Sequence, residues 1–186
     1  MSNQELQTEL AVIGAGHAGI EAALAAARMG VETVLFTLSL DAVANMPCNP
    51  SIGGTAKGHL VFEIDALGGE MGRAADCVTL QSRTLNLGKG AAVQSKRVQA
   101  DRKQYQRLMK HTLETTPHLR LVQAEIVAIR TEATPDGIKH VVGLETKLGE
   151  VWSCRAIVVA TGTYLEGTVF VGNVSYDGGP DRLLPA

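Results

Sequence analysis

The sequence predicts an α/β fold in which a parallel sheet packs against helices and is joined by an antiparallel β-meander. A short apolar run, a glycine-rich turn and an alanine-rich helical pattern follow one another at residues 10–30. A second apolar run at residues 33–37 completes a strand-helix-strand unit, which forms parallel sheets. Short β-patterned runs with brief turns occupy residues 126–160, as is typical of a meander.

The glycine-rich turn has the G-x-G-x-x-G spacing of Rossmann-type dinucleotide-binding folds, with its glycines at Gly14, Gly16 and Gly19. The first glycine permits the sharp turn, the second lets backbone amides approach a pyrophosphate, and the third lets the helix lie against the strand. A tight structural turn, with His17 as a simple filler, is the alternative interpretation. The residues predicted here to bind a cofactor are Gly14, Ala15, Gly16, His17, Ala18 and Gly19.

The end of the second predicted strand lacks the acidic residue that usually holds the ribose of a dinucleotide. That residue is expected about twenty positions beyond the glycines, but Thr37 stands there. Glu32 precedes the strand and Asp41 follows it, so neither acid is well placed. The pattern therefore disfavours a simple NAD-dependent dehydrogenase and leaves the ribose ligand open.

Residues 41–100 are predicted to be an insert between the second strand and a later helix. Two prolines and three glycines at residues 46–58 exclude an ordinary helix or central strand, so we expect a shaped loop. Short helices are expected at residues 60–67 and 70–76. A capping-box pattern, Asp followed three residues later by Gln, then predicts a helix over residues 101–114.

The last predicted parallel strand ends in a turn of small residues. Such residues let backbone approach a ligand at the carboxyl end of a strand, where open parallel sheets bind ligands. Residues 172–186 show no clear element. The strands expected after the helix lie at residues 119–122, 126–132, 140–147 and 150–160, and the further predicted cofactor-binding residues are Ala160, Thr161 and Gly162.

Composition and charge set the remaining expectations. The net charge of −2 gives no general attraction to nucleic acid, although residues 83–113 are markedly basic, with Asp101 as their only acid. A solvated helix face and a phosphate-binding surface are both open interpretations of that stretch.

The polar start of the chain and the absence of a long apolar run predict a cytoplasmic protein. The cysteines, Cys48, Cys77 and Cys154, have no C-x-x-C spacing, so we predict free thiols and no metal site.

The order of these elements resembles the nucleotide half of FAD-dependent enzymes of the glutathione-reductase type, whose last strand returns from much later in the chain. Residues 1–186 would then be the amino-terminal, incomplete part of a discontinuous FAD-binding domain. More specific motifs resemble the flavoprotein subunit of the tRNA wobble-uridine carboxymethylaminomethyl-modification enzyme, also called the glucose-inhibited division protein A family. These motifs lie at residues 14–19, 25–30, 48–54, 57–61, 63–69, 99–102 and 162–167.

The resemblance implies an enzyme that uses FAD, NADH and methylene-tetrahydrofolate to deliver one carbon to carbon 5 of the wobble uridine of tRNA. Glycine or ammonium would supply the amine. It also implies a GTPase subunit as partner, a homodimer, and a much longer complete chain, so that these residues alone would not complete a turnover.

The resemblance further implies roles for individual residues. Gly14 to Gly19 would hold the FAD pyrophosphate, and the backbone of Ile126 would contact the adenine side. Cys48 matches a cysteine regarded as catalytic, either attacking the uridine or assisting proton transfer near the flavin. The nearby Lys57 would favour its thiolate, whereas an inert buried thiol is the alternative. The residues predicted to face tRNA are Lys57, Arg83, Lys89, Lys96, Arg97 and Arg102.

The sequence is also compatible with two other functions. A related folate- and FAD-dependent tRNA uridine methyltransferase shares the glycine turn, although we expect it to lack the Cys-Asn-Pro-Ser-Ile-Gly-Gly block at residues 48–54. A standalone nucleotide-binding or partner-docking module would instead bind nucleotide tightly and unfold cooperatively by itself.

Overall fold

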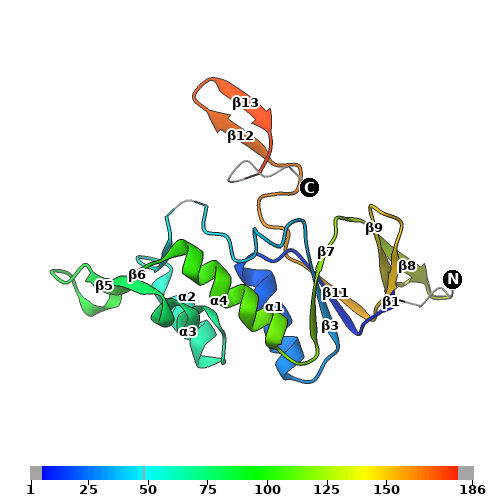
Figure 1. The fold of residues 1–186 in the computed structure, drawn as a ribbon, viewed down its shortest axis with the longest axis horizontal. Coiled ribbons are helices and arrows are strands. Elements are labelled where there is room, and N and C mark those ends of the chain that lie inside the picture. The colour runs from blue at the N-terminus through cyan, green and yellow to red at the C-terminus, as the bar shows by residue number, and fades with distance from the viewer. Residues whose placement is uncertain (1–5, 48, 180–186) are drawn as a thin grey trace. The chain divides into compact units, whose positions relative to one another are not determined.

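The computed structural model describes residues 6–47 and 49–179, which divide into two compact units (Figure 1). The first unit comprises residues 1–43 and 113–186, and the second comprises residues 44–112. Cys48, the predicted catalytic residue, lies outside the described residues.

A four-stranded parallel sheet forms the centre of the first unit. Its strands are β11 (Ala156–Val159), β2 (Leu10–Ile13), β3 (Thr33–Thr37) and β7 (Leu119–Gln123), in that spatial order. Every neighbouring pair is parallel. The predicted α/β class and the strand-helix-strand unit are therefore confirmed, and β3, which lies inside the sheet, is buried along its whole length.

Helix α1 (His17–Arg28) connects β2 to β3 and contacts β2, β3, β7 and β11. Its buried side chains include Ile20 and Leu24, which are completely covered. Burying each stabilises the fold by about 1.5–3 kcal/mol. Small alanines fill the rest of the buried face, so the helix axis lies close to the sheet.

A second four-stranded sheet packs against the first. Its strands are β1 (Leu6–Gln7), β10 (Val151–Ser153), β9 (Lys139–Thr146) and β8 (Ile126–Ala133), in that order, with β8, β9 and β10 antiparallel. The core between the sheets contains Phe36 and Trp152, whose rings meet edge to face at 5.3 Å. The guanidinium of Arg120 lies 4.8 Å from the centre of the Trp152 ring.

The strand predicted over residues 150–160 is in fact two strands in two different sheets. β10 pairs with β9 in the antiparallel sheet, whereas β11 pairs with β2 in the parallel one. At the crossing, the amides of Arg155 and Ala156 both donate to the carbonyl of Glu9. No glycine or proline stands at the crossing, so the sequence alone indicates one strand where the fold has two.

The tail also differs from expectation, because residues 172–179 include a strand. β13 (Val174–Asp177) pairs with β12 (Thr168–Val171) in a two-stranded hairpin. β13 alternates apolar and polar residues over only four positions, and all four of its side chains are exposed, so this short pattern did not predict a strand.

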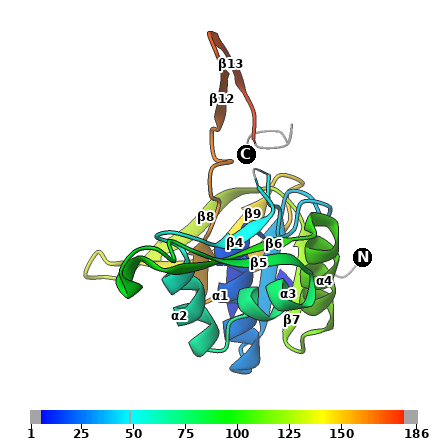
Figure 2. The ribbon, with the colours of Figure 1, turned by 90° about the vertical axis from the view of Figure 1, so that its left-hand side faces the viewer.

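The second unit contains a three-stranded antiparallel sheet that the sequence did not predict (Figure 2). Its strands are β4 (Ser51–Gly53), β6 (Ser95–Ala100) and β5 (Thr79–Leu85), in that order, and a short 3-10 helix, Ala91–Val93, lies between β5 and β6. The expected helices are confirmed as α2 (Gly58–Ala66), α3 (Met71–Cys77) and α4 (Arg102–Thr115). Besides the expected helices, residues 44–112 therefore contain a sheet of their own.

The predicted capping residues do begin α4. The Oδ1 atom of Asp101 accepts hydrogen bonds from the amides of Lys103, at 3.0 Å, and Gln104, at 2.9 Å. The Gln104 side chain donates back to Oδ2 at 3.0 Å. The two bonds from Gln104, first the backbone and then the side-chain one, lower the pKa of Asp101 most.

Candidate functional site

The turn between β2 and α1 is held by contacts within the first unit. Gly14 has φ +106°, and its amide donates to the carbonyl of Phe36 at 2.9 Å. A Cβ atom at Gly14 would lie 2.4 Å from the carbonyl oxygen of Ala160, and one at Gly19 would lie 1.8 Å from the carbonyl oxygen of Gly14. These two glycines are therefore required by the protein's own packing.

Gly16 is different from the other two glycines. Its φ of −75° and ψ of 178° suit any residue, and among the described residues a Cβ atom there would meet no atom within 4 Å beyond its own chain neighbours and helix backbone. Neither backbone strain nor internal packing explains a glycine at this position. The missing side chain leaves open space directly in front of the first turn of α1, which is the space that a ligand's phosphates would need.

The first turn of α1 can hold an anion. Gly16 is the N-cap of the helix, no side chain in the described residues caps it, and the first turn contains no acidic residue. The amides of a helix's first turn point outward without partners inside the helix, and they carry the positive end of its dipole. Such an arrangement binds phosphate groups.

The turn that follows β11 lies beside the glycine turn. The amide of Ala160 donates to the carbonyl of Ile13 at 2.8 Å, which joins the ends of β11 and β2. Gly162 has φ +62° and open space where a side chain would be. The structure thus brings the predicted residues Gly14 to Gly19 and Ala160 to Gly162 to one edge of the parallel sheet.

His17, the first residue of α1, is half-buried. Loss of water around the ring lowers the pKa of His17 below its ordinary value of 6.5, and the Glu21 carboxylate opposes this effect more weakly. The imidazole is therefore largely neutral at pH 7. Attraction for an anion at this turn then comes from backbone amides rather than from a charged histidine.

The ribose position at the end of β3 offers no free carboxylate on the strand itself. Thr37 donates its hydroxyl to the carbonyl of Ser39 at 3.1 Å, so its side chain serves the local loop. The Gln123 side chain likewise accepts the amide of Leu40 at 3.1 Å. Asp41 is exposed in the same loop.

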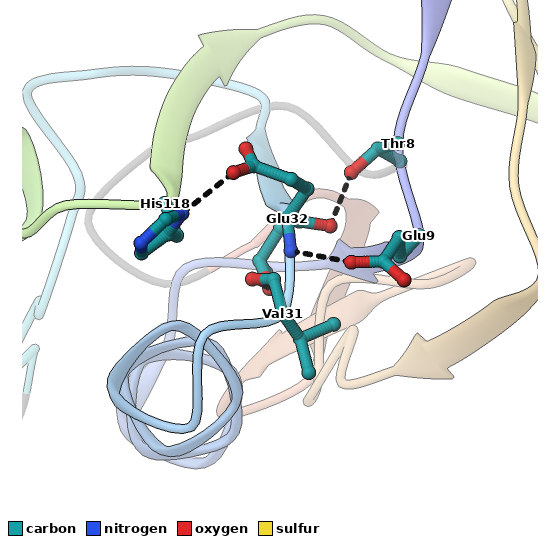
Figure 3. Close-up of polar contacts among 6 residues, drawn as sticks. Thr8, Glu9, Val31, Glu32 and His118 are labelled. Carbon is teal, nitrogen blue, oxygen red and sulfur yellow. Dashed lines mark hydrogen bonds and ion pairs between the residues drawn. The ribbon is translucent and has the colours of Figure 1, made fainter.

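Glu32 lies at the opposite edge of the sheet, before β3 begins (Figure 3). Its carboxylate is 2.6 Å from Nδ1 of His118, which precedes β7. Its amide donates to the carboxylate of Glu9 at 3.1 Å, and its carbonyl accepts the hydroxyl of Thr8 at 2.7 Å. Glu32 thus ties strand ends together and does not face the glycine turn.

The other predicted site residues lie elsewhere. Ile126 begins β8, opposite Thr146, and its side chain packs against the core around Trp152. The basic residues predicted to face tRNA belong to the second unit. Lys57, Arg83, Lys89, Lys96 and Arg97 are exposed there, whereas the partly buried Arg102 donates from Nη2 to the Asn45 side chain at 2.8 Å.

The structure adds one arrangement that sequence reasoning missed, because it depends on strand register. Arg83 on β5 lies directly opposite Arg97 on β6.

Among the described residues, no helix has the length and apolar character needed to cross a membrane. Nor does any group of three or more His, Cys, Asp or Glu side chains in residues 6–47 and 49–179 have an arrangement that would hold a metal ion.

Comparisons with known proteins identify the family of this chain. The family model described as glucose inhibited division protein A matches residues 9–186. A relative from Caldicellulosiruptor saccharolyticus, named tRNA uridine 5-carboxymethylaminomethyl modification enzyme MnmG, is 53% identical over 178 residues, which are 96% of this chain and 28% of the relative. This chain therefore spans little more than a quarter of that relative's length.

Solved structures give the same result. The structure of Aquifex aeolicus GidA matches 97% of this chain and 29% of its own, with 47% identity and a TM-score of 0.88. The GidA-related protein from Thermus thermophilus shares the fold at 23% identity and a TM-score of 0.67, over 96% of this chain and 64% of its own. The chain belongs to the glucose inhibited division protein A family.

Proposed function

We propose that this chain is the FAD-binding part of an enzyme that installs the carboxymethylaminomethyl group on the wobble uridine of tRNA. The observation that carries the nucleotide site is the open space at Gly16, in front of the uncapped first turn of α1. The relative that is 53% identical is named as a tRNA uridine 5-carboxymethylaminomethyl modification enzyme. A glycine that neither the backbone nor the packing requires is best explained by a bound ligand.

The chain's own residues would bind and orient the cofactor. Backbone amides of the turn from Gly14 to Gly19 would hold the FAD pyrophosphate, and Gly162 would let the β11 turn approach the same ligand. His17 would stay largely neutral, so the phosphates would be bound by backbone amides and not by a charged imidazole. The bound flavin would supply redox chemistry to the transfer of one carbon.

Further roles are inferred from the resemblance to the family. NADH would reduce the flavin, and methylene-tetrahydrofolate would donate the carbon delivered to carbon 5 of the uridine. Cys48 would act as the catalytic residue, and the backbone of Ile126 would contact the adenine side. The complete enzyme would be a cytoplasmic homodimer that works with a GTPase subunit.

Titration with FAD tests the nucleotide site directly. Adding FAD to the purified 186-residue chain should quench flavin fluorescence and shift the flavin absorbance, with saturation at a stoichiometric ratio. Absence of binding would contradict the proposal that this chain holds the site. For the reaction, Cys48→Ser in the complete enzyme should abolish wobble-uridine modification while FAD binding persists. Normal modification by that variant would remove Cys48 from the mechanism.

A further inference from the structure

The sheet of the second unit carries two arginines directly across from each other. Arg83 on β5 is the register partner of Arg97 on β6, and the residue beyond Arg97 on β4 is Gly53. Directly opposed residues of an antiparallel pair have Cβ atoms about 4.5–5.5 Å apart, and like charges there destabilise the pair. The repulsion between the two guanidinium groups therefore does not help the sheet to fold.

The two strands that carry the arginines contain no compensating acid. Residues 77–100, which include β5 and β6, contain four basic residues and no Asp or Glu. Among the described residues, neither Arg83 nor Arg97 forms an ion pair. The side chains of Arg83 and Arg97 are both exposed. Val98, which follows Arg97 on β6, and its register partner Ile52 on β4 are buried on the other face of the sheet.

Arg97 is held in place by neutral neighbours. Its Nη2 atom donates to the hydroxyl of Ser51 at 3.3 Å. The adjacent row on the same face pairs Gln81 with Gln99. Two guanidinium groups, a hydroxyl and two amides thus share one polar face that supplies hydrogen-bond donors and two positive charges.

We propose that Arg83 and Arg97 together clamp a phosphate group of the RNA backbone. Each guanidinium presents a planar fork of donors that matches a phosphate, and one phosphate between them would offset their mutual repulsion. The donors of Gln81, Gln99 and Ser51 continue the row along the sheet, which suits a chain of phosphates and sugars better than a single small anion. The inference rests on the proposed function, in which the substrate is a tRNA.

The test is RNA binding by the 186-residue chain carrying Arg83→Gln and Arg97→Gln together. The neighbouring Gln81–Gln99 pair shows that glutamines fit this register. The matched control carries Arg130→Gln and Lys139→Gln, which remove two exposed charges from β8 and β9 of the other sheet. Fluorescence anisotropy would follow a labelled tRNA anticodon stem-loop at several salt concentrations.

The slope of log K against log salt should fall by about 1 to 2 in the clamp variant and by much less in the control. Equal losses in both variants would overturn the clamp, because they would reflect only net charge. Absence of RNA binding by the unmodified chain would overturn it as well.

FAD titration of the same variants separates the two sources of phosphate. Unchanged FAD affinity in the clamp variant supports an RNA phosphate, whereas lost FAD affinity would assign the pair to the cofactor and overturn the proposal. Retained FAD binding together with a failed clamp would leave the proposed nucleotide site standing.

Discussion

The two edges of the same parallel sheet are built in opposite ways. At the carboxyl edge, the turns after β2 and β11 present glycines, including Gly16 and Gly162, with open space in front of them. At the amino edge, Glu32 joins Glu9, Thr8 and His118 through hydrogen bonds and an ion pair (Figure 3). One edge leaves backbone donors for a ligand, and the other uses its charged side chains on itself.

In this fold the candidate site and the cluster of charged side chains around Glu32 lie at different edges of the sheet. Glu32 and His118 would attract attention in a search for catalytic groups, yet their partners are each other and the ends of strands. The candidate site contains no charged side chain in the first turn of α1 and depends on backbone amides. Substitutions at the two edges should therefore separate stability from binding.

The largest effect is expected at Gly19. Gly19→Ala would place a Cβ atom 1.8 Å from the carbonyl oxygen of Gly14, so α1 must move away from β2. Such overpacking against backbone should lower the free energy of unfolding by about 3 kcal/mol or more. Urea denaturation followed by circular dichroism measures the change, and a loss below about 1 kcal/mol would show that the turn has slack.

The next effect is on binding and is expected at Gly16. Gly16→Ala adds a methyl group to open space, so it should alter the free energy of unfolding by less than about 1 kcal/mol. FAD affinity should fall about 100-fold, because the methyl group occupies the space of the phosphates. The variant would be compared with the unmodified chain by fluorescence titration.

Gly90→Ala is the matched control for Gly16→Ala. Gly90 is also an N-cap with negative φ and open space around a Cβ atom, but it precedes the short 3-10 helix of the second unit. It should leave FAD affinity unchanged. Similar affinity losses in both variants would mean that Gly16 has no special place in binding.

His17 gives a smaller effect that depends on pH. Its pKa is lowered in the folded chain by burial, so the unfolded chain binds a proton more readily below about pH 6.5. This histidine therefore reduces stability as the pH falls from 7 towards 5, and His17→Gln should flatten that part of the stability profile. Thermal unfolding at a series of pH values measures it, with His140→Gln as a control for loss of an exposed imidazole. An unaltered profile in His17→Gln would contradict the assignment.

The smallest effect is expected at the amino edge. Glu32→Gln removes an exposed ion pair with His118, which should cost less than about 1 kcal/mol, and the backbone bonds of Glu32 stay intact. FAD affinity should not change. A clear loss of affinity would make Glu32 a ribose ligand after all and would erase the contrast between the edges.

Much of the parallel sheet could be predicted because its signals are local in the chain. Strand β2, the glycine turn and α1 are contiguous, so spacing alone identifies them. Helices α2, α3 and α4 were marked in the same way by apolar spacing, glycine stops and the Asp101 cap. The role of Gly16 beside a pyrophosphate stays a prediction, and its difference from Gly14 and Gly19 could be seen only in the structure.

The rest depended on pairings between distant segments. Residues 150–160 contain no glycine or proline that would mark a break, and only their partners, β9 for β10 and β2 for β11, divide them between sheets. Strand β5 is exposed along nearly its whole length, so it has no buried face that an apolar pattern could indicate. Without the register of β5 and β6, the opposed pair of Arg83 and Arg97 could not be predicted. Cys48 lies outside the described residues, so its role stays a prediction.

The most direct test of the contrast between the edges is a map of backbone amide signals by nitrogen-proton NMR before and after FAD is added. The largest shifts should occur in the turn from Gly14 to Gly19 and at Thr161 and Gly162, while Thr8, Glu9, Glu32 and His118 stay in place. Shifts centred on the amino edge, or none in the glycine turn at saturating FAD, would contradict it.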